Sequence, residues 1–464
     1  MNLLIKNAKT LLDDHFEITD VRVKNEKIVE IGKNLIHKEE KIIDCLNEYY
    51  LLPGFIDSHT HFGLGSGIDA TADDFYNSSK LAASSGITTF IDFSDQVDGK
   101  PLYQGAQERI DEAKEAAIDY TLHQGFYSMM DDVKSQLLEL KAKGINTLKI
   151  FTTYKKYGVY LDSCEYEKLF KLCKELNIMI CCHCEDDQVI SEIEKNCDCD
   201  LSEYYSHSIL RASKAESSAI NNILSAAKKF DLPIYIVHVS SKEGLEEIQK
   251  YRKEMIVIAE TTNHYLLLDN SYLKREDGYR YLMTPPLREI SDNRILQKAL
   301  KKNFFDIVAS DHCSYLDTQK NCYSDIRDIP SGIPGSQELP LILSGIIGKS
   351  DDSLIKLSKL VSQNPAKIFG LFPQKGSIRV GSDGDFVILR KQERKFSSSD
   401  ILSKTNFSAF VDRDINIIPI YTILRGNIIF DNGVFKLEKG FGKFVKTHNS
   451  SIFNLEYPVE NYIH

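Results

Sequence analysis

Two histidines separated by one residue stand at the end of an apolar run, with the residue types and spacing of metal ligands. The run begins at Tyr49, is interrupted at Pro53-Gly54, and ends in His59 and His61. In an extended segment, side chains two positions apart point to the same face, so both imidazoles could reach one ion. Neutral imidazole is a common ligand for zinc. The alternative is a chance surface or packing pair, because a His-x-His pair alone is weakly specific.

Four further ionisable residues lie in or at the end of other apolar runs. Lys149 lies within one run, and His183, His238 and Asp311 end three others. If these runs are parallel strands of a closed barrel, their carboxyl ends open on one face, where the active sites of such barrels are built. Each residue alone could be a hydrogen-bonded rim residue. Together with the histidine pair, the four predict one site at the barrel mouth.

Lys149 is the unusual member of this set, because an ammonium within an apolar strand costs several kcal/mol unless it is paired. One interpretation is a salt bridge, with Asp311 or Asp92 as the partner. The other is that burial and nearby metal lower the pKa of Lys149, so that its neutral amine adds carbon dioxide and becomes a carbamate. A carbamate carries two anionic oxygens and could bridge two metal ions.

The region from residue 51 to 374 alternates short apolar runs with amphipathic stretches, which predicts strands and helices in turn. Helical spacing is clearest in Glu165–Leu176, Ala212–Phe230 and Lys242–Arg252. Eight apolar runs separated by helices predict an α/β fold, a (β/α)8 TIM-like barrel. An open doubly wound sheet uses the same elements, but the Gly-rich phosphate loops that would favour it are missing. The eight runs are Leu51–Asp57, Ile87–Phe93, Tyr120–Phe126, Thr147–Phe151, Ile178–Cys182, Ile234–Val239, Met255–Glu260 and Asp306–Ser310.

Both chain ends read instead as short strands with one polar face. Val21–Lys24 and Lys27–Ile31 alternate apolar and polar residues around the turn residues Asn25-Glu26, and similar strands return after residue 375, one pair around Asp431-Asn432-Gly433. Neither end has enough apolar surface to fold alone. We therefore expect one small β-sandwich domain from residues 1–50 and 375–445, with the barrel of residues 51–374 inserted between them. Residues 446–464 are expected to form a C-terminal arm on a neighbouring subunit.

The length and composition of the chain limit its class. Its 464 residues allow one large barrel plus a smaller domain, or three ordinary domains. A hydrophobic fraction of 42% is typical of a globular protein, and a net charge of -10 argues against nucleic acid or an anionic membrane as the main partner. The chain begins without a basic leader and has no apolar run near the roughly 20 residues of a membrane span. We expect a cytoplasmic protein that acts on small molecules, with its ten cysteines as thiols.

Several of these cysteines gather around the fifth apolar run. Cys181, Cys182 and Cys184 flank His183, and Cys197 and Cys199 follow. One interpretation is a separate structural zinc site. We prefer the interpretation that the cysteines are small apolar residues of a buried strand. Only His183 is then a ligand in this stretch.

The successive motifs of the chain, from the first strands to about residue 440, resemble those of the cyclic amidohydrolases, and most closely the dihydropyrimidinase and hydantoinase branch of the amidohydrolase superfamily. Each motif is modest, but their order makes the resemblance specific. The matching stretches are Gly54–His61, Thr71–Phe75, Gly86–Phe93, Lys149–Lys155, His183–Asp186, His238–Ser241, Met283–Arg288, Ser310–Cys313, Gly332–Gly335, Asn364–Gly370 and Lys375–Ile378.

The resemblance implies a binuclear zinc site. It implies one Zn²⁺ held by His59, His61, Lys149 and Asp311, and a second Zn²⁺ held by Lys149, His183 and His238. Lys149 would be carboxylated (N6-carboxylysine) and would bridge the ions together with a hydroxide, which two metals make available near neutral pH. Asp311 would take the proton of the attacking hydroxide and pass it to the leaving nitrogen, and Tyr154 would donate to the developing oxyanion. From the sequence alone, Tyr154 could equally be a tyrosine packed on the barrel rim.

The implied reaction opens the ring of 5,6-dihydropyrimidines or 5-substituted hydantoins to give N-carbamoyl amino acids, as in pyrimidine degradation, and the implied assembly is a homotetramer or homodimer. The chain departs from the branch where the cyclic ureide would bind through backbone groups: Thr284 replaces the usual Ser and Ser331 the usual Asn. The stretch of residues 62–68 also differs from the Pro-Phe loop of the branch, and we expect it to alter which ring substituent fits.

Three alternatives belong to the same superfamily: dihydroorotase, allantoinase and non-catalytic scaffold homologues. Dihydroorotases place an Arg two residues after the second histidine to bind the substrate carboxylate, whereas this chain has Gly63 there. A charged substrate would therefore bury an unpaired carboxylate. Scaffold homologues have lost metal ligands, whereas all six ligand positions are filled here. Ring-opening hydrolysis of a neutral ring is the favoured interpretation.

Overall fold

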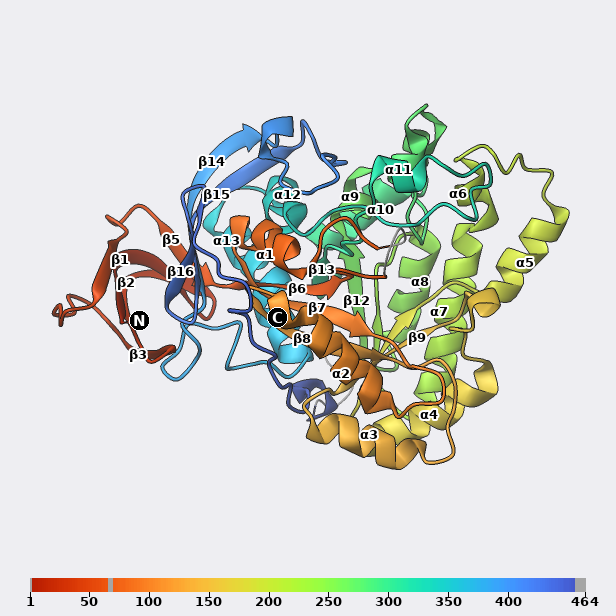
Figure 1. The fold of residues 1–464 in the computed structure, drawn as a ribbon, viewed down its shortest axis with the longest axis horizontal. Helices are drawn as coiled ribbons and strands as arrows, with labels where there is room; N and C mark the ends of the chain where they lie inside the picture. Colours follow the sequence, from red (N-terminus) through yellow and green to blue (C-terminus); the bar gives the residue numbers. More distant parts are fainter. Residues whose placement is uncertain (1, 66–69, 455–464) are drawn as a thin grey trace.

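The computed structural model describes residues 2–65 and 70–454 and contains a barrel beside a smaller β-domain (Figure 1). In Figure 1 the N-terminal strands, in red, and the C-terminal strands, in blue, lie side by side at one end of the molecule, and the barrel occupies the other. Within the described residues, no helix has both the length and the apolar character that crossing a membrane requires.

Eight parallel strands form the barrel, in the order in which they follow along the chain. The first and last strands are joined beyond their ends: the amide of Asp311 donates to the carbonyl of His59 (3.0 Å), and the amide of His61 donates to the carbonyl of His312 (2.9 Å). The predicted (β/α)8 barrel is therefore confirmed. Its strands are β6 (Phe55–Thr60), β7 (Ile87–Ser94), β8 (Asp119–Gly125), β9 (Thr147–Phe151), β10 (Met179–His183), β11 (Ile234–Ile236), β12 (Val257–Thr262) and β13 (Ile307–Ala309).

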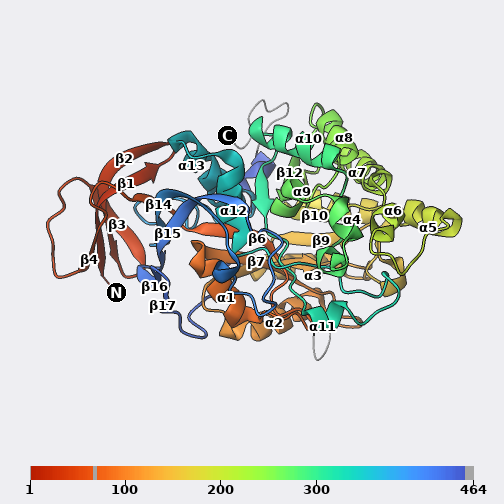
Figure 2. The ribbon, with the colours of Figure 1, turned by 90° about the horizontal axis from the view of Figure 1, so that it is seen from above.

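Helices follow the strands and surround them (Figure 2). The predicted helical stretches are confirmed as α4, α7 and α8. In α4, Asp162 and Glu165 form a capping box at the start, and Tyr166, Leu169, Phe170 and Cys173 form the buried face. The helices are α1 (Phe75–Ser84), α2 (Leu102–Glu112), α3 (Val133–Ala142), α4 (Ser163–Leu176), α5 (Asp187–Asn196), α6 (Ser206–Leu210), α7 (Ser213–Lys228), α8 (Lys242–Tyr251), α9 (Asn263–Leu267), α10 (Ile290–Lys301), α11 (Asp317–Lys320), α12 (Glu338–Ile347), α13 (Asp351–Ser358) and α14 (Asn364–Ile368).

The first predicted barrel strand, Leu51–Asp57, is divided in the structure. Its first half belongs to β5 (Tyr50–Pro53), which pairs with strands of the small domain, and only β6 belongs to the barrel. The prediction of one strand is therefore wrong. The division falls at Pro53-Gly54, where a Cβ on Gly54 would lie 2.2 Å from the Oγ1 atom of Thr88. Only glycine allows the chain to pass this close to β7 while it changes sheets.

The small domain is assembled from both chain ends, as predicted, and its strands form one mixed sheet. The expected hairpins are present: β2 and β3 are joined through Asn25 and Glu26, and β16 and β17 through Asn432 and Gly433, all with positive φ. Positive φ at both central residues is what the type I′ turn of a two-residue hairpin requires. Besides β5, the strands are β1 (Leu3–Leu12), β2 (His15–Lys24), β3 (Lys27–Gly32), β4 (Lys41–Asp44), β14 (Phe386–Lys395), β15 (Asp414–Leu424), β16 (Asn427–Asp431) and β17 (Val434–Phe435).

A buried ionic cluster joins the small domain to the base of the barrel. The Lys375 ammonium lies 2.6 Å from Asp119 at the start of β8, 2.5 Å from Asp385 and 3.0 Å from Asp383. Arg425 pairs with the other oxygen of Asp119. These three aspartates are close enough together to hold a metal ion. The Lys375 ammonium, however, already lies among them and neutralises part of their charge.

The expected C-terminal arm is described as far as residue 454. The amide of Thr447 donates to the carbonyl of Gly144 (2.8 Å), the amide of His448 donates to Gly370 (2.9 Å), and Ile452 is buried. This part of the arm packs on its own chain, and the expected contact with a neighbouring subunit stays a prediction for it as well. Residues 455–464 lie outside the described residues, and there the expected contact with another subunit stays a prediction.

Candidate metal centre and substrate cavity

Three of the predicted ligands meet where β6 and β13 end. The Nε2 atom of His59 lies 3.2 Å from Oδ1 of Asp311, and the Nε2 atom of His61 lies 3.3 Å from the same oxygen. One ligand atom from each residue lies within 4.8 Å of the others. Two imidazole nitrogens and a carboxylate oxygen at this spacing are a donor set that suits zinc.

Backbone conformation aims two of the site residues into the mouth. Asp311 and His238 have φ values of 51° and 39°, in the left-handed region that side chains other than glycine avoid. Such a conformation costs on the order of 1–3 kcal/mol and persists where surrounding contacts impose it. For Asp311, that contact is its amide hydrogen bond to His59. The strain therefore lies at two predicted metal ligands.

Glu260, in β12, orients two histidines, and no role was predicted for it from the sequence. Its Oε1 accepts from Nδ1 of His59 (2.9 Å) and from the amide of His238 (2.9 Å), and Tyr235 bonds its other oxygen. Burial lowers the pKa of His59 well below its ordinary value, so that imidazole is neutral. With its proton on Nδ1, toward Glu260, His59 would direct the lone pair of Nε2 at Asp311. The sequence signal that could have identified Glu260 is its position at the end of the apolar run Met255–Glu260.

Lys149 lies in the wall of the same site with 2% of its surface exposed. Its Nζ lies 4.8 Å from the ring centroid of Phe93 and 5.1 Å from that of Phe151, and burial lowers its pKa. The first interpretation, a salt bridge, is not what the structure has: Asp92 pairs with Arg109 (2.7 Å), and no ion pair of the described residues includes Lys149. Its amine is thus buried, short of a counter-ion and close to the other ligands.

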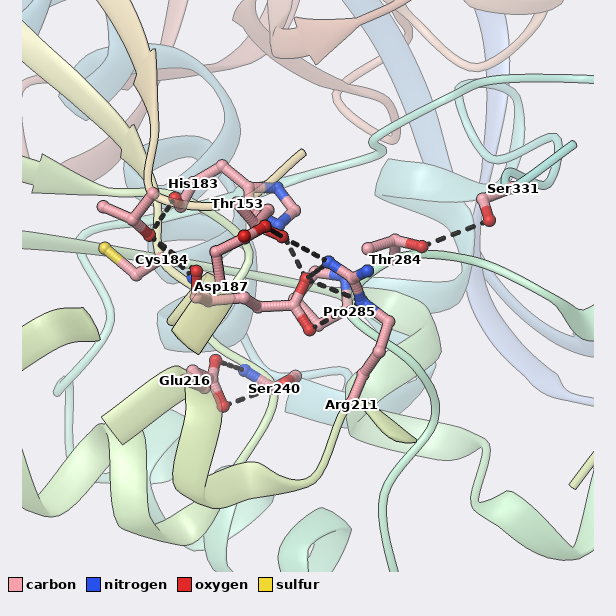
Figure 3. A network of polar contacts seen from close by, with 12 residues as sticks. Thr153, His183, Cys184, Asp187, Arg211, Glu216, Ser240, Thr284, Pro285 and Ser331 are labelled. Atoms are coloured by element: carbon pink, nitrogen blue, oxygen red, sulfur yellow. Dashed lines mark hydrogen bonds and ion pairs between the residues drawn. The ribbon is translucent and has the colours of Figure 1, made fainter. Parts of the chain in front are cut away.

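His183 lies at the end of β10 and is held from behind by a buried ion pair. Its Nε2 lies 2.8 Å from Glu185, whose carboxylate accepts three hydrogen bonds from Arg211 at 3.1, 3.1 and 2.6 Å. Figure 3 shows Arg211 extending toward His183 and Thr153. Burial would raise the pKa of Glu185, but Arg211 outweighs it and holds that pKa below its usual range. Since Glu185 occupies Nε2, His183 keeps Nδ1 for another partner.

A second buried carboxylate supports the loop that follows His238. Glu216 accepts from the amide (2.8 Å) and the hydroxyl (2.9 Å) of Ser240, as Figure 3 shows. Arg288 donates to the same hydroxyl (2.9 Å) and to the carbonyl of Arg211. The supports of His183 and His238 are therefore connected through one chain of polar contacts. The ring centroids of His183 and His238 lie 4.6 Å apart.

The six predicted ligands line one cavity of about 230 Å³, together with all three predicted substrate residues. Tyr154 lies beside His183, and burial raises its pKa to about 12, so its phenol is protonated and can donate at neutral pH. The hydroxyl of Thr284 donates to that of Ser331 (3.1 Å), and Figure 3 shows these two side chains facing one another. Tyr154, Thr284 and Ser331 also line an outer cavity of about 440 Å³. Of the expected mouth segment, residues 62–68, only residues 62–65 are described, and residues 66–68 lie outside the described residues.

The cysteines near His183 divide into two kinds. Cys181, Cys182 and Cys184 are buried thiols in or directly after β10, which agrees with the apolar interpretation. None of them belongs to a potential ligand group found among the described residues. Cys197 and Cys199, after α5, are joined by a disulfide. The prediction that all ten cysteines are thiols is therefore wrong for this pair.

Comparison with known proteins agrees with this fold and site. Residues 50–429 match the amidohydrolase family, so the chain belongs to that family. A D-hydantoinase of Ralstonia pickettii is 32% identical over 458 residues, covering 96% of this chain and 99% of that protein. A dihydropyrimidinase of Arabidopsis thaliana is 30% identical over 454 residues, covering 96% and 85%. The crystal structure of dihydropyrimidinase from Brevibacillus agri superimposes with a TM-score of 0.92 at 31% identity, covering 97% of this chain and 99% of that one.

Within its family, the chain is a cyclic amidohydrolase of the branch that contains hydantoinases and dihydropyrimidinases. Its substrate is a small molecule with a cyclic amide bond. The amidohydrolase family is generally metal-dependent, and His59, His61 and Asp311 form a group suited to a metal ion.

Proposed function

We propose that this enzyme uses zinc to open the ring of 5,6-dihydropyrimidines or 5-substituted hydantoins, with N-carbamoyl amino acids as products. The observation that carries the proposal is the meeting of His59, His61 and Asp311 at the floor of a cavity that also contains Lys149, His183 and His238. The names of the relatives, hydantoinases and dihydropyrimidinases, support the choice of ring.

The residues present suit two zinc ions. Burial lowers the pKa of His183 to about 4 and that of His238 well below its ordinary value, so both imidazoles are neutral donors. Burial also favours the neutral amine of Lys149, the form that reacts with carbon dioxide. His59, His61 and Asp311 would hold one ion, His183 and His238 the other, and carboxylated Lys149 both. When bound, the ions would supply Lewis acidity that lowers the pKa of a water and polarises the scissile carbonyl.

The protein side chains carry the proton and the developing charge. Asp311 would accept a proton from the attacking water and return it to the leaving ring nitrogen. Burial alone would raise the pKa of Asp311, but the histidines around it, including a hydrogen bond from His61, hold that pKa well below its usual range, so its carboxylate is ionised and able to accept. The phenol of Tyr154 would donate to the oxyanion. The segments at Thr284 and Ser331 would bind the cyclic ureide.

The charge of the cavity favours a neutral ring over dihydroorotate. Among the described residues, no arginine lines the inner cavity. Arg109, near Gly63, pairs with Asp92, and Arg211 pairs with Glu185. A substrate carboxylate would therefore lack the bidentate partner that arginine supplies. A non-catalytic scaffold is disfavoured because all six ligand positions are filled, and allantoinase stays the nearest alternative.

The test is a comparison of four rings on zinc-loaded enzyme: dihydrouracil, a 5-substituted hydantoin, dihydroorotate and allantoin. We expect hydrolysis of the first two to be at least tenfold faster in kcat/KM, and elemental analysis to give two zinc ions per chain. A preference for dihydroorotate would refute the proposal, and a preference for allantoin would keep the chemistry but change the substrate. The homotetramer or homodimer and the cytoplasmic location stay predictions.

A further inference from the structure

A lysine outside the metal centre is buried without a carboxylate partner. Lys320, the last residue of the short helix α11, has 3% of its surface exposed. No ion pair of the described residues includes it. Its Nζ meets three backbone carbonyls instead, those of Gly332 (2.8 Å), Leu282 (2.9 Å) and Arg280 (3.4 Å). An ammonium has three N–H donors and no acceptor, so these contacts use its whole hydrogen-bonding capacity.

The carbonyls that Lys320 binds belong to the two segments of the proposed substrate site. Leu282 lies two residues before Thr284, and Gly332 directly follows Ser331. One segment precedes α10 and the other follows β13, and neither has regular secondary structure at these positions. Among the described residues, the backbone of these two segments is linked at these positions by the hydrogen bond from the amide of Gly332 to the carbonyl of Leu282 (2.9 Å). Segments that lack the hydrogen bonds of a helix or a sheet need contacts of this kind to keep one conformation.

The helix that carries Lys320 also contacts a third segment of the chain, at Ala70. The side chain of Gln319 donates to the carbonyl of Ala70 (2.8 Å), and Asp317 accepts from Arg280 (2.9 Å). The helix therefore contacts the two segments that line the cavity and the segment at Ala70. Among the residues of this helix that make these contacts, Lys320 is the most deeply buried.

We propose that Lys320 is a positioning residue that holds the Leu282–Thr284 and Ser331–Gly332 segments in register, so that together they bind the cyclic ureide. The inference rests on the proposed function, because it takes these segments as the substrate site. Lys320 does not line the inner cavity, so it acts through the two segments and not by contact with the substrate.

Loss of the charge on Lys320 would leave its two short hydrogen bonds, to Gly332 and Leu282, in place. Burial lowers the pKa of Lys320 to about 7. A neutral amine keeps two N–H donors, enough for the carbonyls of Gly332 and Leu282, and gives up only the longer contact to Arg280. An apolar side chain of similar length would lose all three.

The test uses Lys320→Met and Lys320→Gln in the full zinc-loaded enzyme, with Lys253→Met, at an exposed lysine, as the matched control. For Lys320→Met we expect KM for dihydrouracil or hydantoin to rise about tenfold, on the scale of two lost buried hydrogen bonds, and kcat to change less than about threefold. Zinc content should equal that of the parent. Hydrogen exchange should accelerate in peptides that cover residues 281–284 and 331–333. Lys320→Gln keeps an N–H₂ group on a shorter side chain, so its KM and its exchange rates should lie between those of the parent and of Lys320→Met.

Parent-like exchange in these peptides would overturn the proposal, and so would accelerated exchange with an unchanged KM. If Lys320→Met does not fold, Lys320→Gln decides by the same two measurements. If the parent hydrolyses none of the four rings, the proposed function fails. Hydrogen exchange then decides separately whether Lys320 holds the two segments together.

Discussion

Replacing Arg211 by Met should destabilise the protein and also weaken its metal binding, because Arg211 is the one cation among the described residues that pairs with the buried Glu185. The substitution removes three hydrogen bonds to that carboxylate and a contact of the guanidinium with the ring of Tyr154, 5.1 Å away. Removing one member of a buried ion pair typically costs about 3–5 kcal/mol, because the other charge stays buried. We expect the free energy of unfolding to fall by about that amount.

A double substitution distinguishes the loss of stability caused by the unpaired buried charge from the loss caused by missing packing contacts. Arg211→Met/Glu185→Gln removes both charges but keeps an acceptor for His183, so it should recover more than about half of the loss. The measurement is urea unfolding of the metal-free protein by circular dichroism, since the chain has no tryptophan. Arg294→Met, at an exposed arginine, is the control. A double variant no more stable than Arg211→Met would refute the reasoning.

The effect of Arg211 on stability should also depend on pH with a defined sign. Because Arg211 depresses the pKa of Glu185, the pair stabilises the folded state at pH values above the unfolded pKa of about 4.3. This stabilisation is lost as the pH falls toward the folded pKa. The gap between parent and Arg211→Met should therefore narrow below about pH 4.3. Zinc affinity, measured by chelator competition at pH 7, should fall about 10–100-fold through the loosened His183.

Four other variants test the site and the domain contact. Asp311→Asn should lower kcat at least about a hundredfold in steady-state assays, because the proton acceptor is lost. Tyr154→Phe should keep its zinc by elemental analysis and lose about a hundred- to a thousandfold in kcat; a parent-like kcat would remove its oxyanion role. Lys149→Ala should lose one of two zinc ions together with activity, whereas two retained ions would exclude the bridge. Lys375→Met should lower the free energy of unfolding by about 3–5 kcal/mol, because three aspartates lose their buried cation; unchanged urea unfolding would contradict this.

The sequence by itself determined the barrel and the position of its site. Strand and helix periodicities are local patterns, and β-hairpin turns such as Asn25-Glu26 act over a few residues, so both can be read along the chain. Parallel strands in a barrel point their carboxyl ends to one face. Strand-end residues such as His59 and Asp311 could therefore be placed together before any coordinates were known.

The tertiary structure decided what holds those residues in place. Glu260 binds His59 across 201 positions of the sequence, and Arg211 binds Glu185 across 26, so no periodic signal connects them. The change of sheets at Gly54 depends on contact with Thr88 in another strand, and the role of Lys320 depends on carbonyls from two loops. A buried polar group must find its partner wherever the fold brings one within hydrogen-bonding distance, and that distance is set by packing, not by spacing along the chain.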